Sequence, residues 1–413
     1  MVMGSVSQRL VFLSICVAVL SFASLTSAQQ NGLIPNTAVG PATDAGGHAI
    51  SAGQAAANSD LATFTYTVTS SRDGNTYTGA MVGQDPFGSD FSTTNIDTLI
   101  IPVILITNTI AVASPNGKIL TTKPGVTVFD PTTADDVCLT SPNDVPVNLM
   151  VQSPIFQSAT FNFGPTAVGT TQYLDAFQRG NFWSFVGGTP YHTILNPHVL
   201  PAVVVNLPGK QGLAGSFGGA CGPLAIVDFE VMKQQIFNKL LASESANIDS
   251  SKFPIFLFYN TVMATNSAGG SNCCILGFHN AVTQSPAPNK SARVQTYAFI
   301  DFEASGAFPS FINDTSIAAH EVGEWMDDPF GNNPTPAWGH TGQVGGCQNN
   351  LEVGDPLTGN NVPVVTGSNG FSYHLQELAF FSWFYGAPSI AVNSWFSDNN
   401  TFKTDAGPVC TKH

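Results

Sequence analysis

Residues 314–329 read DTSIAAHEVGEWMDDP and predict a helix that carries the most informative chemistry in the chain. Asp314 is a suitable N-cap residue, because its side chain can accept a hydrogen bond from the first helical turn. Pro329 disfavours helical geometry in the residue before it, so the helix ends there. These two residues bound a helix of about 14 residues.

The predicted helix has a polar side and an apolar side. His320, Glu324 and Asp327 lie together on the polar side. The opposite side carries apolar residues: Ala318, Val322, Trp325 and Met326. Gly323 is a poor helix residue in the polar half, which indicates that something approaches the backbone closely there. We expect the apolar side to be buried and to hold the polar side in place.

The H-E-x-x-E pattern of this helix is typical of metal-dependent hydrolysis. His320 and Glu324, one turn apart, can aim two ligand atoms at one metal ion, and Glu321 beside them can take a proton from a metal-bound water. Carboxylates ligate zinc, but one imidazole with two carboxylates also suits calcium or manganese. The alternative interpretation is a solvated, charged helix face. We expect a metal site, with zinc as the first candidate ion.

A third ligand must come from elsewhere in the chain. Residues 350–356, NLEVGDP, offer Glu352 and Asp355, which share a face if the segment is helical. Histidines elsewhere in the chain are the alternatives: His279, His340 and His374. A lone histidine is more often an ordinary hydrogen-bonded residue, so the two acidic residues are the preferred candidates.

Strands and helices alternate around the predicted metal site. The patterns predict helices over 172–183 and 226–241 and strands over 202–207, 253–262 and 294–302. This alternation favours a sheet that is packed by helices.

The region before residue 150 has patterns of strands and not of alternating strands and helices. Alternating residues at 63–70 and 76–82, with the turn DGN at 73–75, predict a β-hairpin. Residues 96–107 predict a strand that is apolar on both faces and therefore central in a sheet. Residues 29–60 have almost no large apolar side chain, so we expect a flexible leader followed by a β-rich N-terminal region over 61–150.

The first 28 residues have the order of a secretory signal peptide. Arg9 precedes the apolar run 10–25, and small residues at 26–28 suit cleavage near Ala28. Later apolar stretches are too short or too interrupted to span a bilayer. We expect an exported protein, extracellular or periplasmic, without stable membrane insertion.

Composition excludes several classes of protein. The chain has 413 residues, of which 43% are hydrophobic and 10% charged, so it can bury a large core and is neither disordered nor fibrous. The formal net charge is -14, and the basic residues form no run that could neutralise phosphates. Nucleic acid is therefore not an expected partner.

The cysteines favour disulfides. Cys16 lies in the predicted signal peptide, which leaves an even number in the mature chain: Cys138, Cys221, Cys273, Cys274, Cys347 and Cys410. We expect three disulfides, with the adjacent Cys273 and Cys274 bonded to different partners. A cysteine-ligated zinc site is disfavoured, because paired C-x-x-C spacing is missing.

Several of these segments together resemble a family of exported, zincin-like metallopeptidase-type proteins. In that family H-E-x-x-E-x-x-x-D-P is followed by a tryptophan and then by E-[IV]-G-D, as here at 320–329, Trp338 and 352–355. GFH at 277–279, YAF at 297–299 and YHLQE at 373–377 are similar to its other segments. The plant phosphate-induced, exordium-like secreted proteins share a looser version.

The resemblance implies an α+β fold for residues 151–413: a zincin-like mixed sheet with packed helices and an active-site helix. It implies His320 and Glu324 as metal ligands and Glu321 as general base. By the same resemblance, Glu352 ligates the metal and Asp355 braces His320.

The expected function is that of a secreted, metal-dependent peptidase acting on proteins or peptides, with zinc as the expected ion. The alternative is a non-catalytic extracellular or cell-wall-associated protein with a structural ion or a degenerate site. A serine hydrolase is disfavoured, because the chain has no G-x-S-x-G elbow.

Overall fold

The computed structural model describes most of the chain from Asn36 onward. The described residues are 36–40, 42–44, 48–113, 119–135, 137–207, 209, 211–217, 219–244, 246–265, 272–284, 291–359, 362–386, 389–403 and 410. The predicted signal peptide lies outside them.

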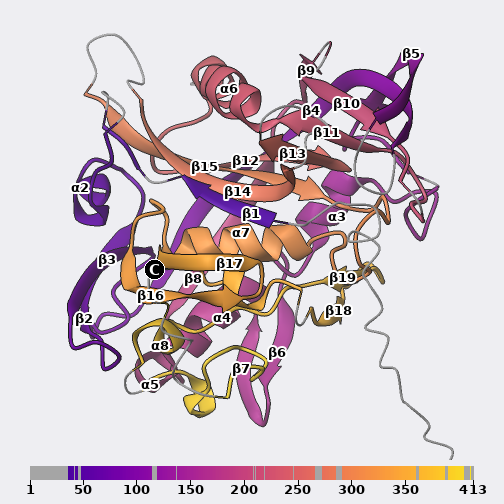
Figure 1. Ribbon diagram of the computed structural model, residues 1–413. Coiled ribbons are helices and arrows are strands. Elements are labelled where there is room, and N and C mark those ends of the chain that lie inside the picture. The colour runs from indigo at the N-terminus through magenta and orange to yellow at the C-terminus, as the bar shows by residue number, and fades with distance from the viewer. Residues whose placement is uncertain are drawn as a thin grey trace, which may run out of the picture.

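Strands dominate the fold and close into a barrel (Figure 1). Seven strands form the ring in the order β14, β13, β11, β10, β4, β12 and β15, and β15 pairs again with β14. Their bounds are β4 Thr93–Ala113, β10 Gly212–Gly215, β11 Leu224–Asp228, β12 Phe253–Tyr259, β13 Thr261–Thr265, β14 Asn272–Gln284 and β15 Arg293–Phe302.

Further strands extend this sheet. The long strand β4 also pairs with β5 (Ile119–Phe129), β8 (His192–Val199) and β9 (Val203–Leu207). The N-terminal strand β1 (Asn36–Gly40) pairs with β14 in parallel. Strand β4 thus joins the N-terminal part of the chain to the part that follows residue 150.

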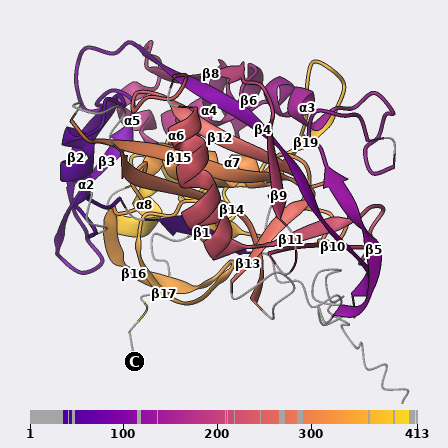
Figure 2. The same ribbon diagram turned by 90° about the horizontal axis from the view of Figure 1, so that it is seen from above.

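Four hairpins and several short helices surround the sheet (Figures 1 and 2). The hairpin strands are β2 Thr63–Thr69 with β3 Thr76–Val82, β6 Ala159–Phe163 with β7 Thr166–Thr171, β16 Pro334–Thr341 with β17 Val344–Asn350, and β18 Val364–Thr366 with β19 Ser372–His374. The helices are α2 Ala52–Ala57, α3 Pro146–Gln152, α4 Tyr173–Asn181, α5 Trp183–Val186, η1 Val231–Phe237 (a π-helix), α6 Asn238–Ser243, α7 Ser316–Asp327, η2 Asp355–Leu357, α8 Phe381–Tyr385 and η3 Val392–Ser394.

The expected zincin-like α+β fold is wrong. The protein is 41% strand and 19% helix, and its central sheet closes into the seven-stranded barrel instead of remaining an open sheet packed by helices. The error has a physical origin. A strand that is apolar on both faces is buried on both sides. This pattern fits an open sheet covered by helices and a closed barrel equally well. Only the closure of the ring, in which β14 pairs with both β13 and β15, distinguishes the two.

The predicted helix over 226–241 is also partly wrong. Its first residues belong to β11, where Ile226 pairs with Val262 of β13, and the helical part begins only at η1. Phe237 and Leu241 of the predicted stripe are buried against the sheet, as a core helix requires. Strand pairing therefore overrides the helical periodicity at the start of this segment.

Several local predictions are confirmed. The β2–β3 hairpin, strand β15 and helix α4 lie where the patterns place them. The helix of the H-E-x-x-E motif is α7, but its predicted N-cap is wrong, because the helix begins at Ser316 and Thr315, not Asp314, is in the N-cap position. The segment expected to be a flexible leader contains β1 and α2.

The six cysteines outside the signal region form three disulfides. Cys138 bonds to Cys221, and Cys347 to Cys410. The expectation that adjacent cysteines take different partners is wrong, because Cys273 and Cys274 bond to each other.

A membrane-spanning helix is not found. Among the described residues, every helix is too short or too polar to cross a bilayer.

Candidate metal centre

Helix α7 is buried on all sides, including its polar side. His320, Glu321 and Glu324 expose at most 1% of their surface. The helix packs against β14 and β15 (Figure 1). Trp325, on the apolar side, stacks on Phe253 with 3.7 Å between ring centroids. The alternative of a solvated helix face is thereby excluded.

Gly323 permits a close approach to the helix, but not by a polar group. A Cβ atom at this position would lie 2.5 Å from Cδ1 of Leu378. The glycine thus allows apolar packing behind the polar side chains.

Three side chains converge at the polar side of α7. Nε2 of His320 lies 3.0 Å from Oε1 of Glu324 and 3.4 Å from Oδ1 of Asp355. One ligand atom from each of the three residues lies within 4.8 Å of the others. Asp355 comes from η2, in the segment that the sequence offers as the source of a third ligand. We name this group the metal centre.

The ring of His320 is oriented by a residue from a distant segment. Its Nδ1 lies 3.1 Å from Oε1 of Gln376, and Nε2 of Gln376 donates to the carbonyl oxygen of Gly354 at 2.7 Å. The amide oxygen of Gln376 can only accept, so Nδ1 carries the proton in the neutral ring. Nε2, which faces Glu324 and Asp355, then has the lone pair that a metal ligand needs.

Gly354 is needed for this arrangement. A Cβ atom at Gly354 would lie 2.6 Å from Nδ1 of His320. Any other residue would therefore displace the imidazole from the metal centre.

A second histidine adjoins the metal centre from β14. Nδ1 of His279 lies 3.4 Å from Oε2 of Glu321 and 3.7 Å from Oε2 of Glu324. Glu324 therefore stands between two imidazoles. Oε1 of Glu321 and Nε2 of His279 are buried and have no hydrogen-bond partner among the residues that the structure describes. Of the alternative histidines, His279 is the one that lies at this place.

The two acidic residues of the segment 350–356 make different contacts. Asp355 approaches His320 and also accepts hydrogen bonds from Nε2 of Gln348 at 2.7 Å and from Gln343. Glu352 accepts from Nδ2 of Asn350 at 2.5 Å. Glu352 does not belong to either buried group of converging ligand atoms among the described residues.

Glu324 is held by the same segment. Its Oε1 accepts the backbone N–H groups of Gly354 at 3.2 Å and of Asp355 at 3.3 Å. These hydrogen bonds fix the position of η2 relative to α7.

Among the described residues, the carboxyl groups of this region have a histidine and not a lysine or arginine as their cationic neighbour. Burial raises the pKa of Glu321, Glu324 and Glu352 above the ordinary range for glutamate. Among the described residues, neither lysine nor arginine forms an ion pair with these three glutamates; the ion pairs of Lys252 and Arg293 lie elsewhere. A bound cation would supply the missing positive charge.

The two histidines respond to burial differently. Burial lowers the pKa of His279 to about 3, so this ring is neutral. Burial also lowers the pKa of His320, but the carboxylates of Glu324 and Asp355 outweigh it and raise the pKa well above the ordinary value. Without a metal ion, His320 is thus the cation of the centre.

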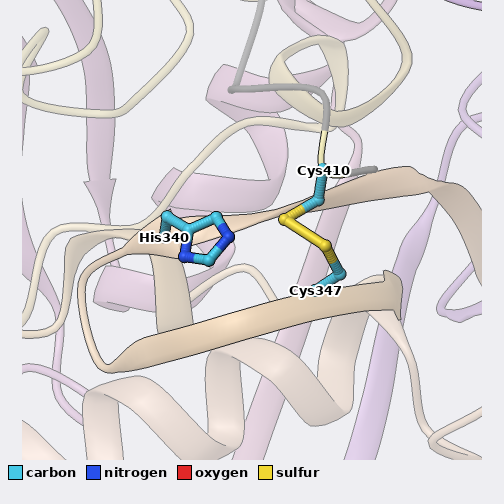
Figure 3. Close-up of side chains that lie close together, drawn as sticks. All are labelled: His340, Cys347 and Cys410. Carbon is cyan, nitrogen blue, oxygen red and sulfur yellow. A yellow bond between two sulfur atoms is a disulfide. The ribbon is translucent and has the colours of Figure 1, made fainter. Parts of the chain in front are cut away.

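The remaining alternative histidines have other contacts. Nδ1 of His374 lies 2.5 Å from Oδ2 of Asp314. His340 lies beside Cys347 and Cys410 (Figure 3), whose sulfur atoms bond to each other and are not available as thiolate ligands.

Sequence reasoning gave no role to the glutamines. Three glutamine side chains contact His320 or Asp355: Gln343, Gln348 and Gln376. An amide does not titrate, and these residues follow no spacing pattern that would identify them as site residues from the sequence. The one available signal was the YHLQE segment at 373–377, which contains Gln376.

Comparisons of the chain with protein-family models, with curated proteins and with solved structures find no match. The geometry of the candidate metal centre is therefore the basis for a proposed function.

Proposed function

We propose that the protein is a metal-dependent peptidase whose ion is held by His320, Glu324 and Asp355. The observation that carries the proposal is the convergence of these three ligand atoms, with Nε2 of His320 facing the two carboxylates. Asp355 takes the place that the sequence gave to Glu352, because it is the carboxylate that reaches His320.

Zinc is the first candidate ion. One imidazole nitrogen and two carboxylate oxygens form a ligand set that zinc accepts, and calcium and manganese are the alternatives. When bound, the ion would polarise the scissile carbonyl and increase the acidity of a water molecule.

Glu321 is the proposed general base. It follows His320 directly on α7, and its Oε1 is buried without a hydrogen-bond partner in the described part of the chain, so one oxygen is available for a proton. A cation nearby would favour the ionised form of this carboxyl group, which the buried site otherwise disfavours. Glu321 would then move the proton from the attacking water to the leaving amine.

An extracellular or periplasmic location is part of the proposal. The three disulfides are compatible with an oxidising compartment, and the signal-like N-terminus is the sequence feature that suggests export. The substrate class is protein or peptide.

Complete burial favours a second candidate function. His320, Glu324 and Asp355 expose 1%, 1% and 5% of their surface, as ligands of a closed structural site do. In this alternative the ion stabilises the attachment of η2 to α7, and the protein is a non-catalytic extracellular or wall-associated protein.

The test combines metal analysis with a cleavage assay. The chain is dialysed against a chelator, reloaded with zinc, manganese or calcium, and assayed for bound ion and for casein cleavage. We expect about one ion per chain and cleavage only by the loaded protein. A stoichiometric amount of bound ion without casein cleavage would favour the structural alternative.

A further inference from the structure

The N-terminal strand β1 lies on the edge of the strand that carries His279 (Figures 1 and 2). The pairing is parallel, and Ala38, Val39 and Gly40 stand opposite Phe278, His279 and Asn280. The backbone of β1 therefore passes directly beside the residue that adjoins Glu321 and Glu324.

This edge of β14 would otherwise be unpaired. Strand β15 pairs with β14 along one edge, over residues 277–284. On the other edge, β13 pairs only with residues 272–275 of β14. Beyond that point β1 takes over, from Ile275 to Asn280. Without β1, a row of backbone N–H and C=O groups would be left open beside the metal centre.

The residues that follow β1 are tied to the far end of α7. The backbone N–H of Ala42 donates to the carbonyl oxygen of Phe330 at 2.7 Å. Nδ2 of Asn332 donates to the carbonyl oxygen of Ile50 at 2.5 Å. Ala52 and Ala55 of α2 pack in one cluster with Ala281 and Phe330. We call the described residues between 36 and 58 the strap, because they run from β14 to the end of α7.

The sequence of β1, NTAVG, contains no large side chain. Strand addition of this kind derives its affinity mainly from backbone hydrogen bonds, which any extended peptide can form. The strap is thus a segment of this chain bound in a place that a separate peptide could also occupy.

We propose that the edge of β14 from Ile275 to Asn280 is a binding site for an extended peptide strand, and that β1 occupies it in the intact chain. The role of that peptide as substrate rests on the proposed peptidase function; the strand site itself does not. Occupation by β1 places this segment along the backbone of His279, whose side chain adjoins the proposed catalytic centre. Release of β1 would open the site.

The experiment weakens β1 within the full chain. Successive N–H groups of a strand point to opposite sides, so one of the two residues Thr37 and Ala38 directs its N–H toward β14. The double variant Thr37→Pro with Ala38→Pro removes that donor. The matched control, Thr37→Ala with Ala38→Ser, keeps both N–H groups.

The probe is a fluorescent peptide with the sequence of residues 33–42, LIPNTAVGPA, and the readout is fluorescence anisotropy. We expect saturable binding to the double-proline chain, at least about 10-fold tighter than to the wild type or the control. Equal binding to all three proteins would overturn the strand site. If the double-proline chain does not fold, Ala42→Pro, which removes the N–H donated to Phe330, takes its place with the same two outcomes.

Casein cleavage by the same zinc-loaded proteins separates the two proposals. Peptide binding without cleavage supports the strand site and contradicts the peptidase. Equal cleavage by all variants without a gain in peptide binding overturns the strand site and leaves the peptidase standing. Cleavage that rises together with peptide binding supports both.

Discussion

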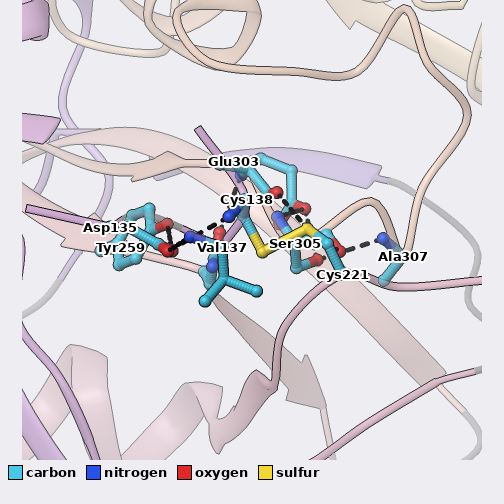
Figure 4. The surroundings of a disulfide bond; sticks show 10 residues. Asp135, Val137, Cys138, Cys221, Tyr259, Glu303, Ser305 and Ala307 are labelled. Carbon is cyan, nitrogen blue, oxygen red and sulfur yellow. Dashed lines mark hydrogen bonds between the residues drawn. A yellow bond between two sulfur atoms is a disulfide. The ribbon is translucent and has the colours of Figure 1, made fainter. Parts of the chain in front are cut away.

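Two of the buried acidic clusters among the described residues differ in whether they have the features of a ligand set. At the metal centre, Glu324 and Asp355 face the imidazole of His320. At the other cluster, Asp301 and Glu303 lie at the end of β15, and Glu303 is near the Cys138–Cys221 disulfide (Figure 4). Both clusters are almost completely buried. Burial of carboxyl groups alone therefore does not identify a metal site.

The second cluster accepts several hydrogen bonds and its charge is reduced by protonation, although Oδ2 of Asp301 and Oε2 of Glu303 have no hydrogen-bond partner among the described residues. Asp301 accepts the N–H of Thr261 at 2.9 Å, and Glu303 accepts the N–H of Ser305 at 2.8 Å and its hydroxyl at 2.5 Å. Burial raises the pKa of Glu303 to about 7 and that of Asp301 further above its ordinary range, and the two groups interact. No ligand nitrogen enters this cluster within the described residues. The two clusters thus differ in that an imidazole faces the acids only at the candidate metal centre, among the described residues.

The largest expected effect is the loss of metal when a shared ligand is removed. Glu324→Ala removes a carboxylate that faces His320, His279 and two backbone N–H groups, so metal affinity should fall by more than about 100-fold. The matched change in the other cluster, Asp301→Asn, should leave metal affinity unchanged. Isothermal titration with zinc measures both. An equal loss of zinc affinity in Glu324→Ala and Asp301→Asn would contradict the assignment of the metal to Glu324.

The general base gives the next effect. Glu321→Gln keeps the shape of the side chain but cannot accept the proton, so peptidase activity should fall by roughly 100- to 10,000-fold while bound zinc stays constant. Glu303→Gln is the control and should retain activity. Casein cleavage and elemental analysis test this, and undiminished activity in Glu321→Gln would remove Glu321 from the mechanism.

Removal of Asp355, which contacts His320, should weaken metal binding more than removal of Glu352, which does not. Asp355→Ala should release zinc on mild dialysis, whereas Glu352→Ala should retain it. Gln376→Ala should weaken affinity by about 10- to 100-fold, since the glutamine only orients His320. Elemental analysis after dialysis gives the order. Release from Glu352→Ala but not from Asp355→Ala would restore the assignment made from the sequence.

The smallest expected effect is a change in the pH dependence of stability. The folded pKa of Glu303 is raised to about 7, so the folded protein binds more protons than the unfolded chain between the unfolded value near pH 4.5 and pH 7. This group therefore makes stability decrease as pH rises through that window. Glu303→Gln should flatten the decrease. Urea denaturation at several pH values measures it, and an unchanged slope would contradict the pKa.

Local features of the metal centre could be predicted, and features made by long-range pairing could not. The apolar stripe of α7 and Pro329 lie within one segment, so the two sides of the helix and its C-terminal end followed from the sequence, whereas its N-cap was placed one residue too early. Asp355 was a candidate because it stands near Glu352, but its contact with His320 depends on η2 docking against α7. Gln376 and His279 reach the centre from other segments, and the patterns YHLQE and GFH that contain them do not indicate which side chains they contact.

The barrel was missed for the same reason. The strands were recognised one by one, yet the pairings of β4 with β10 and β12 and of β1 with β14 connect segments far apart in the chain. Side-chain patterns specify which face of a strand is buried, but not which strand lies next to it. The strap could not be foreseen, because its composition resembles that of a flexible leader.

X-ray absorption spectroscopy of the zinc-loaded protein tests the central claim most directly. The account predicts a zinc shell of nitrogen and oxygen ligands only, with the multiple-scattering signature of one imidazole, which disappears in His320→Ala and is unchanged in His340→Ala. Sulfur ligands, or an imidazole signal that depends on His340, would place the ion at Cys347 and Cys410 instead and contradict the metal centre.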